Sequence, residues 1–151
     1  MKIIKKYFGS KVLVIKPYIF RDVRGYFEES YNKSILKKIG IKETFVQDNL
    51  SLSKANNTFR GIHIQLTPYS QSKLIKVLRG SIIDYVVDLR LNSKTFGKYT
   101  SIKINENDNK QIYIPEGFGH AFLTTNKNTV VSYKVSKFFS KIHSISILYK
   151  K

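Results

Sequence analysis

The chain has 151 residues, of which 42% are hydrophobic and 13% aromatic, a composition typical of one globular domain spanning residues 1–151. It has no cysteine, which excludes disulfides, and no apolar run that suggests a leader or a membrane span, so we expect a cytoplasmic protein without a membrane partner. The net charge of +17 favours anionic ligands, but the lysines are scattered and match no nucleic-acid-binding motif, so we expect no nucleic acid partner.

The first half of the chain predicts short strands around one helix. The helix is expected over residues 32–40, where Asn32 can cap its start and Gly40 fits its end. Extended segments are expected at residues 12–15, 26–31 and 45–49, with a polar turn at 20–25 and a loop at 51–58.

The second half reads almost entirely as strands, expected at residues 73–78, 81–88, 98–104, 111–114, 120–125, 130–135 and 144–149. The first two of these are expected to form a hairpin across Arg79 and Gly80, and residues 105–110 to form a polar hairpin loop. Many short strands with one helix are typical of a β-sandwich or jelly roll.

One stretch carries the candidate chemistry. Residues 59–65 read FRGIHIQ, and strand alternation places Arg60 on one face and His63 with Gln65 on the other. A histidine near cationic side chains is a candidate for proton transfer, although a single strand histidine is more often structural. A second histidine, His120, follows PEGFG at residues 115–119 and favours the catalytic interpretation.

Read together, the two stretches resemble the two motifs of the cupins. His63 and His120 keep two positions of the metal-binding cupins, whereas Gln65 and Gln71 stand where those proteins have a histidine and a glutamate. Amides are poor ligands for transition metals. The resemblance therefore implies an all-β cupin jelly roll with one short N-terminal helix, no metal, and histidines that are free to move protons.

Six motifs in register resemble one family of cupin enzymes. They are FRDVRGYFEE at 20–29, QDN at 47–49, RGIHIQ at 60–65, VDLR with SKTFG between 87 and 97, the segment 114–122, and YK at 133–134. The chain resembles the dTDP-4-dehydrorhamnose 3,5-epimerases of sugar-nucleotide biosynthesis. The resemblance implies an isomerase that inverts C3, C5 or both in a nucleoside-diphosphate 4-keto-6-deoxysugar, with a dTDP-linked sugar preferred and no cofactor.

The resemblance also assigns roles. His63 would remove the proton beside the C4 ketone, Tyr133 would return a proton on the opposite face, and Lys73 would stabilise the enolate oxygen. Arg24 and Arg60 would hold the diphosphate. The full set of expected substrate-binding residues is Phe20, Arg24, Glu29, Gln47, Asn49, Arg60, His120 and Phe139.

Two features depart from the family's pattern. Phe139 stands where the family has a tyrosine that stacks on thymine, which leaves the base specificity open. The family's catalytic histidine also has an aspartate partner near the C-terminus, whereas this sequence has no acidic residue after Glu116. A carboxylate partner for His63 is therefore expected from Asp84, from Asp88 or from another subunit.

The family is dimeric through exchanged N-terminal strands, so the resemblance implies a homodimer with residues 12–15 as the donated strand. The alternative is a catalytically silent sugar-nucleotide or saccharide receptor, which the absent carboxylate favours. A metal cupin that uses His63 and His120 is a third interpretation.

Overall fold

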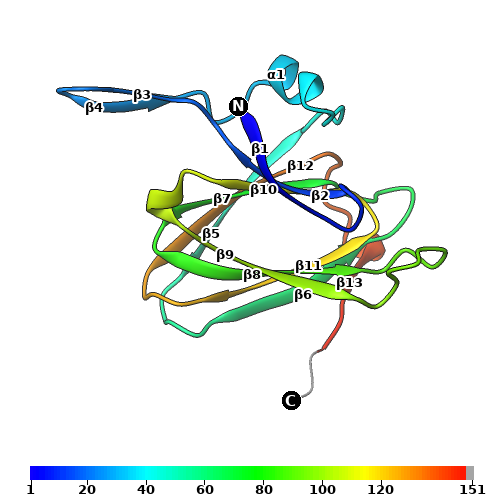
Figure 1. The fold of residues 1–151 in the computed structure, drawn as a ribbon. Helices are drawn as coiled ribbons and strands as arrows, with labels where there is room; N and C mark the ends of the chain where they lie inside the picture. The colour runs from blue at the N-terminus through cyan, green and yellow to red at the C-terminus, as the bar shows by residue number, and fades with distance from the viewer. Residues whose placement is uncertain (149–151) are drawn as a thin grey trace.

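Two antiparallel sheets face each other in the computed structural model, which describes residues 1–148 (Figure 1). The six-stranded sheet has the order β1 (Lys2–Tyr7), β2 (Val12–Lys16), β10 (Gln111–Ile114), β7 (Lys73–Arg79), β12 (Thr129–Val135) and β5 (Gln47–Ser53). The five-stranded sheet has the order β13 (Ser144–Ser146), β6 (Phe59–Gln65), β11 (Phe118–Thr124), β8 (Ser81–Asp88) and β9 (Tyr99–Asn105). The remaining elements are the hairpin of β3 (Ile19–Asp22) and β4 (Gly25–Glu28), helix α1 (Lys33–Lys38), and the short 3-10 helices η1 (Glu106–Asp108) and η2 (Lys141–His143).

The main core lies between the two sheets and follows from strand alternation. In β8, every second residue is buried, so Ile82 and Val86 point inward while Ile83 and Tyr85 stay partly exposed. The buried apolar cluster consists of Val12, Val14, Ile75, Val77, Ile82, Val86, Ile102, Ile104, Ile112, Ile114, Phe118, Phe122 and Val131. Where the inward positions become polar, the same interior forms the pocket described below.

Helix α1 packs on the outer face of the six-stranded sheet. Asn32 caps it, as the sequence predicted, by accepting a 3.1 Å hydrogen bond from the amide of Ile35. Leu36 and Ile41 are fully buried in a second cluster that includes Leu13 and Leu74. The single-helix prediction is therefore confirmed within the described residues.

The predicted hairpin across Arg79 and Gly80 is wrong. Strand β7 pairs with β10 and β12, whereas β8 pairs with β11 and β9 in the other sheet. Gly80, with a φ of 81°, turns the chain from one sheet to the other, so the inward faces of both strands meet across the core. Residues 105–110 likewise link the two sheets, through η1 and a capping box at Asn105, and do not close a hairpin.

Several strand boundaries also differ from the sequence-based expectation. Strand β1 was not predicted, β5 extends through Ser53 into the expected loop, and Phe20 lies in β3 where a turn was expected. The last predicted strand is confirmed only over β13, and its final residue, Tyr149, lies outside the described residues.

The hairpin of β3 and β4 forms an arm that projects from the six-stranded sheet (Figure 1). Four of its apolar side chains, Phe20, Val23, Tyr26 and Phe27, are more than half exposed, as is Tyr18 just before it. At its base, the largely buried carboxylate of Glu28 pairs with Lys76 of β7. Residues 12–15, the expected donor strand, belong to β2 and pair with β1 and β10 within one chain, and their exchange with a partner stays a prediction.

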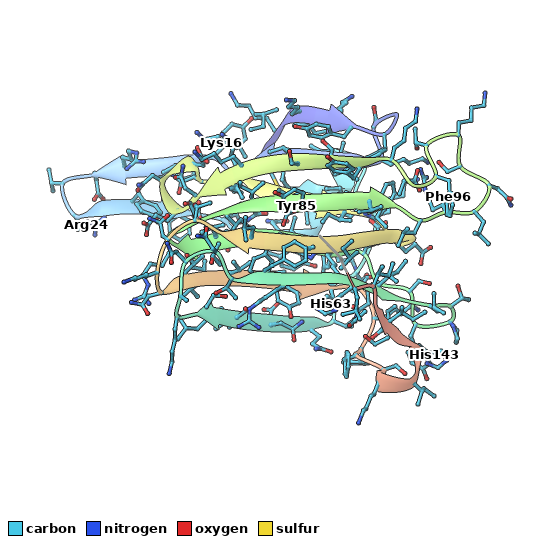
Figure 2. All side chains as sticks on the ribbon, turned by 90° about the horizontal axis from the view of Figure 1, so that it is seen from below. Lys16, Arg24, His63, Tyr85, Phe96 and His143 are labelled. Atoms are coloured by element: carbon cyan, nitrogen blue, oxygen red, sulfur yellow. The ribbon has the colours of Figure 1, made fainter. Side chains whose placement is uncertain are left out.

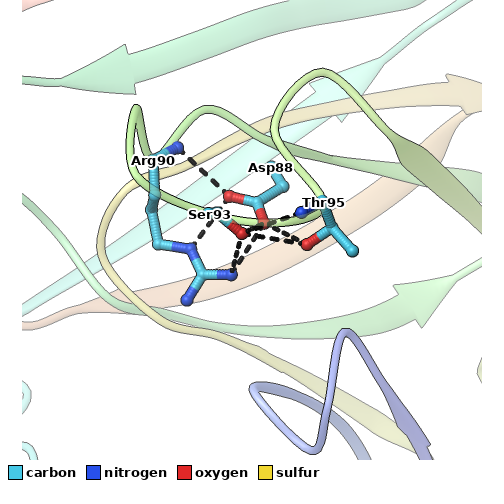
Figure 3. A network of polar contacts seen from close by, with 4 residues as sticks. All are labelled: Asp88, Arg90, Ser93 and Thr95. Atoms are coloured by element: carbon cyan, nitrogen blue, oxygen red, sulfur yellow. Dashed lines mark hydrogen bonds and ion pairs between the residues drawn. The ribbon is translucent and has the colours of Figure 1, made fainter.

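A polar network fixes the loop that follows β8 (Figure 3). The buried carboxylate of Asp88 accepts hydrogen bonds from Arg90 Nε at 2.9 Å, from Ser93 Oγ at 2.6 Å and from Thr95 Oγ1 at 2.5 Å. These bonds, that of Arg90 above all, hold the pKa of Asp88 well below its usual range. The Arg90 guanidinium also lies 4.5 Å from the ring centre of Phe118, so the network supports the start of β11.

Candidate active site

A pocket of about 620 Å³ opens between the two sheets. Strands β5, β7 and β12 form one wall, and β6, β11 and β13 form the other. The lining residues are Gln47, Asn49, Leu50, Ser51, Leu52, Arg60, His63, Ile64, Gln65, Gln71, Lys73, His120, Phe122, Tyr133, Phe139, Ser144 and Ser146. The pocket therefore collects all three predicted catalytic residues.

A bulge in β6 corrects one prediction from strand alternation. His120 pairs with His63 and Phe122 pairs with Arg60, so two steps along β11 match three steps along β6. The extra residue brings Arg60 to the same pocket as His63, although simple alternation placed them on opposite faces. Gly61 is required in this bulge because its φ is 125° and a Cβ there would lie 2.5 Å from that of Ala121.

His63 lies on the five-stranded wall in a cationic environment. Its Nδ1 is 2.9 Å from Ser146 Oγ, and no hydrogen bond to Nε2 is found among residues 1–148. Partial burial, together with the positive charges of Lys73, His120 and Arg60, lowers the pKa of His63 below 6.5. This shift favours the neutral imidazole, which is the form able to accept a proton.

Neither predicted carboxylate is the hydrogen-bond partner of His63. Asp84, fully buried on the inner face of β8, lies 2.6 Å through Oδ2 from Nε2 of His120. Asp88 is held by Arg90, as described above. The two residues expected to partner His63 therefore hydrogen-bond to His120 and to the loop after β8. Within residues 1–148, the side-chain hydrogen bond of His63 is to the Ser146 hydroxyl.

Lys73 is a buried cation in the six-stranded wall. Only 8% of the residue is exposed, and this burial lowers its pKa to about 8, against an opposing effect of Asp84. At pH 7 the ammonium of Lys73 therefore remains charged in most molecules. The pocket thus holds a charged donor in a poorly hydrated place, where its interaction with an oxyanion is stronger than in water.

Tyr133 faces the pocket from β12, across from His63 on β6. It pairs along the sheet with Ile75 and Asn49, so its strand neighbours come from β7 and β5. The imidazole and the phenol therefore belong to opposite walls of one pocket.

Gln47, Asn49, Arg60 and Phe139, four of the predicted binding residues, line this pocket. Gln47 donates to Asn49 Oδ1 at 2.8 Å and accepts from the amide of Phe139 at 3.1 Å. Arg60 donates to Ser53 Oγ and to the carbonyl of Leu52, both at 3.0 Å, which anchors its guanidinium to β5. The lining of the pocket therefore includes two amides, a cation and an aromatic ring.

Three predicted binding residues do not line this pocket within one chain. Phe20 and Arg24 lie on the arm, and Figure 2 shows Arg24 at its tip, far from His63. Arg24 is exposed and pairs with Asp22. Glu29 follows the arm and accepts a 3.0 Å hydrogen bond from Asn32.

Gln65 and Gln71, which occupy metal-ligand positions of other cupins, have different partners here. Gln65 Nε2 donates to the carbonyl of Tyr69 at 2.6 Å, and Gln71 Nε2 donates to that of Lys137 at 2.8 Å. Across residues 1–148, no cluster of three or more histidine, cysteine or acidic side chains is arranged to hold a metal ion. In the same part of the chain, no helix is long and apolar enough to span a membrane.

Comparison with known proteins decides the family. A family model described as dTDP-4-dehydrorhamnose 3,5-epimerase matches residues 10–151. The chain belongs to the dTDP-4-dehydrorhamnose 3,5-epimerase family. The enzyme of that name from Shigella flexneri is 40% identical over 139 residues, which cover 91% of this chain and 76% of the relative.

Solved structures of the family share the fold. The Bacillus anthracis dTDP-4-dehydrorhamnose 3,5-epimerase, solved with TDP and PPi bound, has a TM-score of 0.95 and 40% identity, covering 98% of this chain and 84% of that one. The Legionella pneumophila dTDP-6-deoxy-D-glucose-3,5-epimerase, in complex with dTDP-4-keto-L-rhamnose, has a TM-score of 0.91 and 34% identity, covering 98% and 78%. The predicted all-β cupin fold and the predicted epimerase activity are thereby confirmed, and the silent-receptor alternative is not favoured.

The contacts that sequence reasoning missed are those between distant strands. Ser146 and His63 are separated by 83 residues, and His120 and Asp84 by 36. A signal existed only for the second pair, because alternation places the acidic Asp84 on the inward face of a buried strand.

Proposed function

We propose that His63 and Tyr133 invert a carbon beside the ketone of a dTDP-4-keto-6-deoxysugar, working from opposite walls of the pocket. The observation that carries this proposal is their placement on β6 and β12, in sheets that face each other across one cavity. A base and an acid on opposite sides of a bound ring are what inversion by proton exchange requires. The lowered pKa of His63 favours its neutral form, which supports its role as the base.

In this mechanism, His63 takes the proton from C3 or C5. The electron pair of that C–H bond forms a carbon–carbon double bond, and the C4 carbonyl becomes an enolate oxyanion. The ammonium of Lys73 stabilises the developing charge, since it is buried and still protonated at neutral pH. Tyr133 then donates a proton to the opposite face as the ketone reforms. Proton exchange with solvent returns His63 and Tyr133 to their starting states, and the reaction needs no change of oxidation state.

The mouth of the pocket suits the nucleoside diphosphate. Arg60 offers a guanidinium to a phosphate, Gln47 and Asn49 offer amides, and Phe139 offers a ring face to the base. Bound TDP and a dTDP-linked sugar in the two related structures support thymine as the base. His120, which Asp84 orients, would contact the sugar.

Solvent deuterium tests this function directly. Purified protein is incubated with dTDP-4-keto-6-deoxyglucose in heavy water, and C3 and C5 are followed by proton NMR. Deuterium is expected at C3, C5 or both, which also establishes which centres are inverted. Absence of deuterium from every dTDP-linked or other nucleoside-diphosphate 4-keto sugar offered would contradict the proposal.

We also propose a homodimer in which the arm of one chain completes the pocket of its partner. The arm exposes four apolar side chains and carries Phe20 and Arg24, while Glu29 directly follows it. These three residues are the predicted ligands that do not line the pocket of their own chain. A two-stranded hairpin with aromatic surfaces in water is marginally stable unless another surface covers it. The cytoplasmic location stays a prediction.

Subunit mixing tests this arrangement. Sedimentation should give twice the chain mass of 17.5 kDa. The variants Arg24→Ala and His63→Asn should each be nearly inactive alone, but a re-equilibrated equal mixture should regain about a quarter of wild-type activity, because half of the dimers then hold one intact site. A monomeric mass, or a mixture as inactive as its components, would exclude the exchanged arm.

A further inference from the structure

The segment that joins β12 to η2 crosses from one sheet to the other at the pocket mouth. We call residues 136–140 the strap. Its start is fixed by the Ser136 amide, which donates to the carbonyl of Ser72 at 3.1 Å, and by the Ser136 hydroxyl, which accepts from the Ser72 amide at 2.8 Å. Phe139 lies on the strap and lines the pocket while 62% of the residue is exposed. Apolar packing therefore does little to hold the Phe139 ring in place.

The strap is held instead by the amide of one buried glutamine. Gln65, only 6% exposed, donates through Nε2 to the carbonyls of Tyr69 and Phe138, at 2.6 and 3.1 Å. Its Oε1 accepts from the Ser140 amide at 2.9 Å. The bonds to Phe138 and Ser140 hold the backbone immediately before and immediately after Phe139.

Two further glutamines contact the same segment. Gln47 accepts from the amide of Phe139 at 3.1 Å, and Gln71 donates to the carbonyl of Lys137 at 2.8 Å. Of the three, Gln65 is the one that both donates to the strap and accepts from it. A glutamate at this position could not donate to two carbonyls, and an apolar residue would leave buried backbone groups without partners.

We infer that Gln65 is a positioning residue for nucleotide recognition: it fixes the strap so that Phe139 presents its ring to the base of the substrate. The inference rests on the proposed function in that it identifies the ligand as a dTDP-sugar. Stacking on a fixed aromatic ring strengthens the binding of a base, and a ring on a loose strap loses part of that gain because it must be ordered upon binding. Gln65 thus sets the affinity for the nucleotide and leaves the proton-transfer groups unchanged.

The test compares Gln65→Met with wild type and with Thr124→Val. Thr124 is a matched control because it is also buried and bridges two loop backbone groups, the Thr58 amide and the Ala55 carbonyl, but does not line the pocket. Titration calorimetry gives the Kd for dTDP, exchange kinetics give kcat and KM, and hydrogen exchange reports on the strap amides. Gln65→Met should raise both Kd and KM about tenfold, with kcat within about twofold, and should speed hydrogen exchange at Phe139 and Ser140. Thr124→Val should change none of these quantities.

A double-mutant cycle with Phe139→Ala separates this role from general loosening. If Gln65 acts through the ring, Gln65→Met should add no further loss of dTDP affinity in the Phe139→Ala background. An equal further loss in that background, or an unchanged Kd in the single variant, would overturn the inference. Gln71→Met, which removes one exposed bond to the strap, should give a smaller change in the same direction, so the test does not depend on the folding of a core variant.

Wild-type protein that binds dTDP but incorporates no deuterium would contradict the epimerase mechanism and leave the role of Gln65 standing, whereas wild-type protein that does not bind dTDP would overturn that role.

Discussion

His63→Asn is expected to lower kcat for solvent exchange by a factor of about 10² to 10⁴, the range that a positioned general base contributes. Asparagine keeps a polar side chain of similar length but cannot accept a proton at neutral pH. The His63 side chain is exposed to the pocket and, within residues 1–148, makes one hydrogen bond, to Ser146, so the fold should be retained. The loss should therefore appear in kcat and not in the Kd for dTDP or in the unfolding temperature.

The pH dependence adds a second check on the base. Burial and the nearby cations lower the pKa of His63, so the neutral, active form persists to a lower pH than for an ordinary histidine. In wild type, kcat/KM should therefore rise with pH through an apparent pKa below that of an ordinary histidine. A variant with wild-type exchange rates, or an acidic limb centred above pH 7, would show that another group is the base.

Lys73→Met is expected to lower kcat/KM for exchange by a factor of about 10² to 10³, the cost of removing one donor aimed at a developing oxyanion. Methionine matches the length of the side chain but carries no charge to stabilise the enolate. The matched control is Lys134→Met, on the outward face of the neighbouring strand β12, where the lysine pairs with the exposed Asp48 and does not line the pocket. That control should leave kcat/KM unchanged.

The same lysine predicts the alkaline limb of the profile. Its pKa of about 8 means that the ammonium is lost as the pH rises through this value, so wild-type kcat/KM should fall above about pH 8. The effect on stability has the opposite sign. The unfolded chain keeps this proton to a higher pH than the folded chain, so the contribution of Lys73 to the free energy of unfolding increases as the pH rises from about 8 to the ordinary lysine value of 10.5. An alkaline limb that persists unchanged in Lys73→Met would assign it to a different group.

The positions and faces of the strands were predictable because alternation is a local pattern. The pairing partners of the strands were not predictable, because they lie far away in the sequence. Alternation in β8 indicated its two faces correctly, and Asn32 indicated the start of α1. The glycine turn at Gly80 looked like a hairpin turn, but a turn of the same length can also pass the chain between facing sheets. Which of the two occurs depends on contacts with β10, β11 and β12, which lie far away in the sequence.

In the active site too, local motifs were predictable, whereas contacts between distant strands were not. The motifs indicated His63, Lys73 and Tyr133, and the structure brings all three to one pocket. The bulge at Gly61 broke the alternation that separated Arg60 from His63, because one inserted residue reverses the side of every residue beyond it. The Ser146 contact depends on the pairing of β13 with β6, which no local pattern marks.

The most direct test of the central claim separates proton removal from proton return. Tyr133→Phe keeps His63 and the ring of the opposite wall but removes the phenolic proton. In heavy water, this variant should incorporate deuterium beside the ketone of dTDP-4-keto-6-deoxyglucose while inversion at the same carbon falls by a factor of about 10² or more. If exchange and inversion instead fall together, or if inversion continues at the wild-type rate, His63 and Tyr133 do not act on opposite faces of one bound sugar.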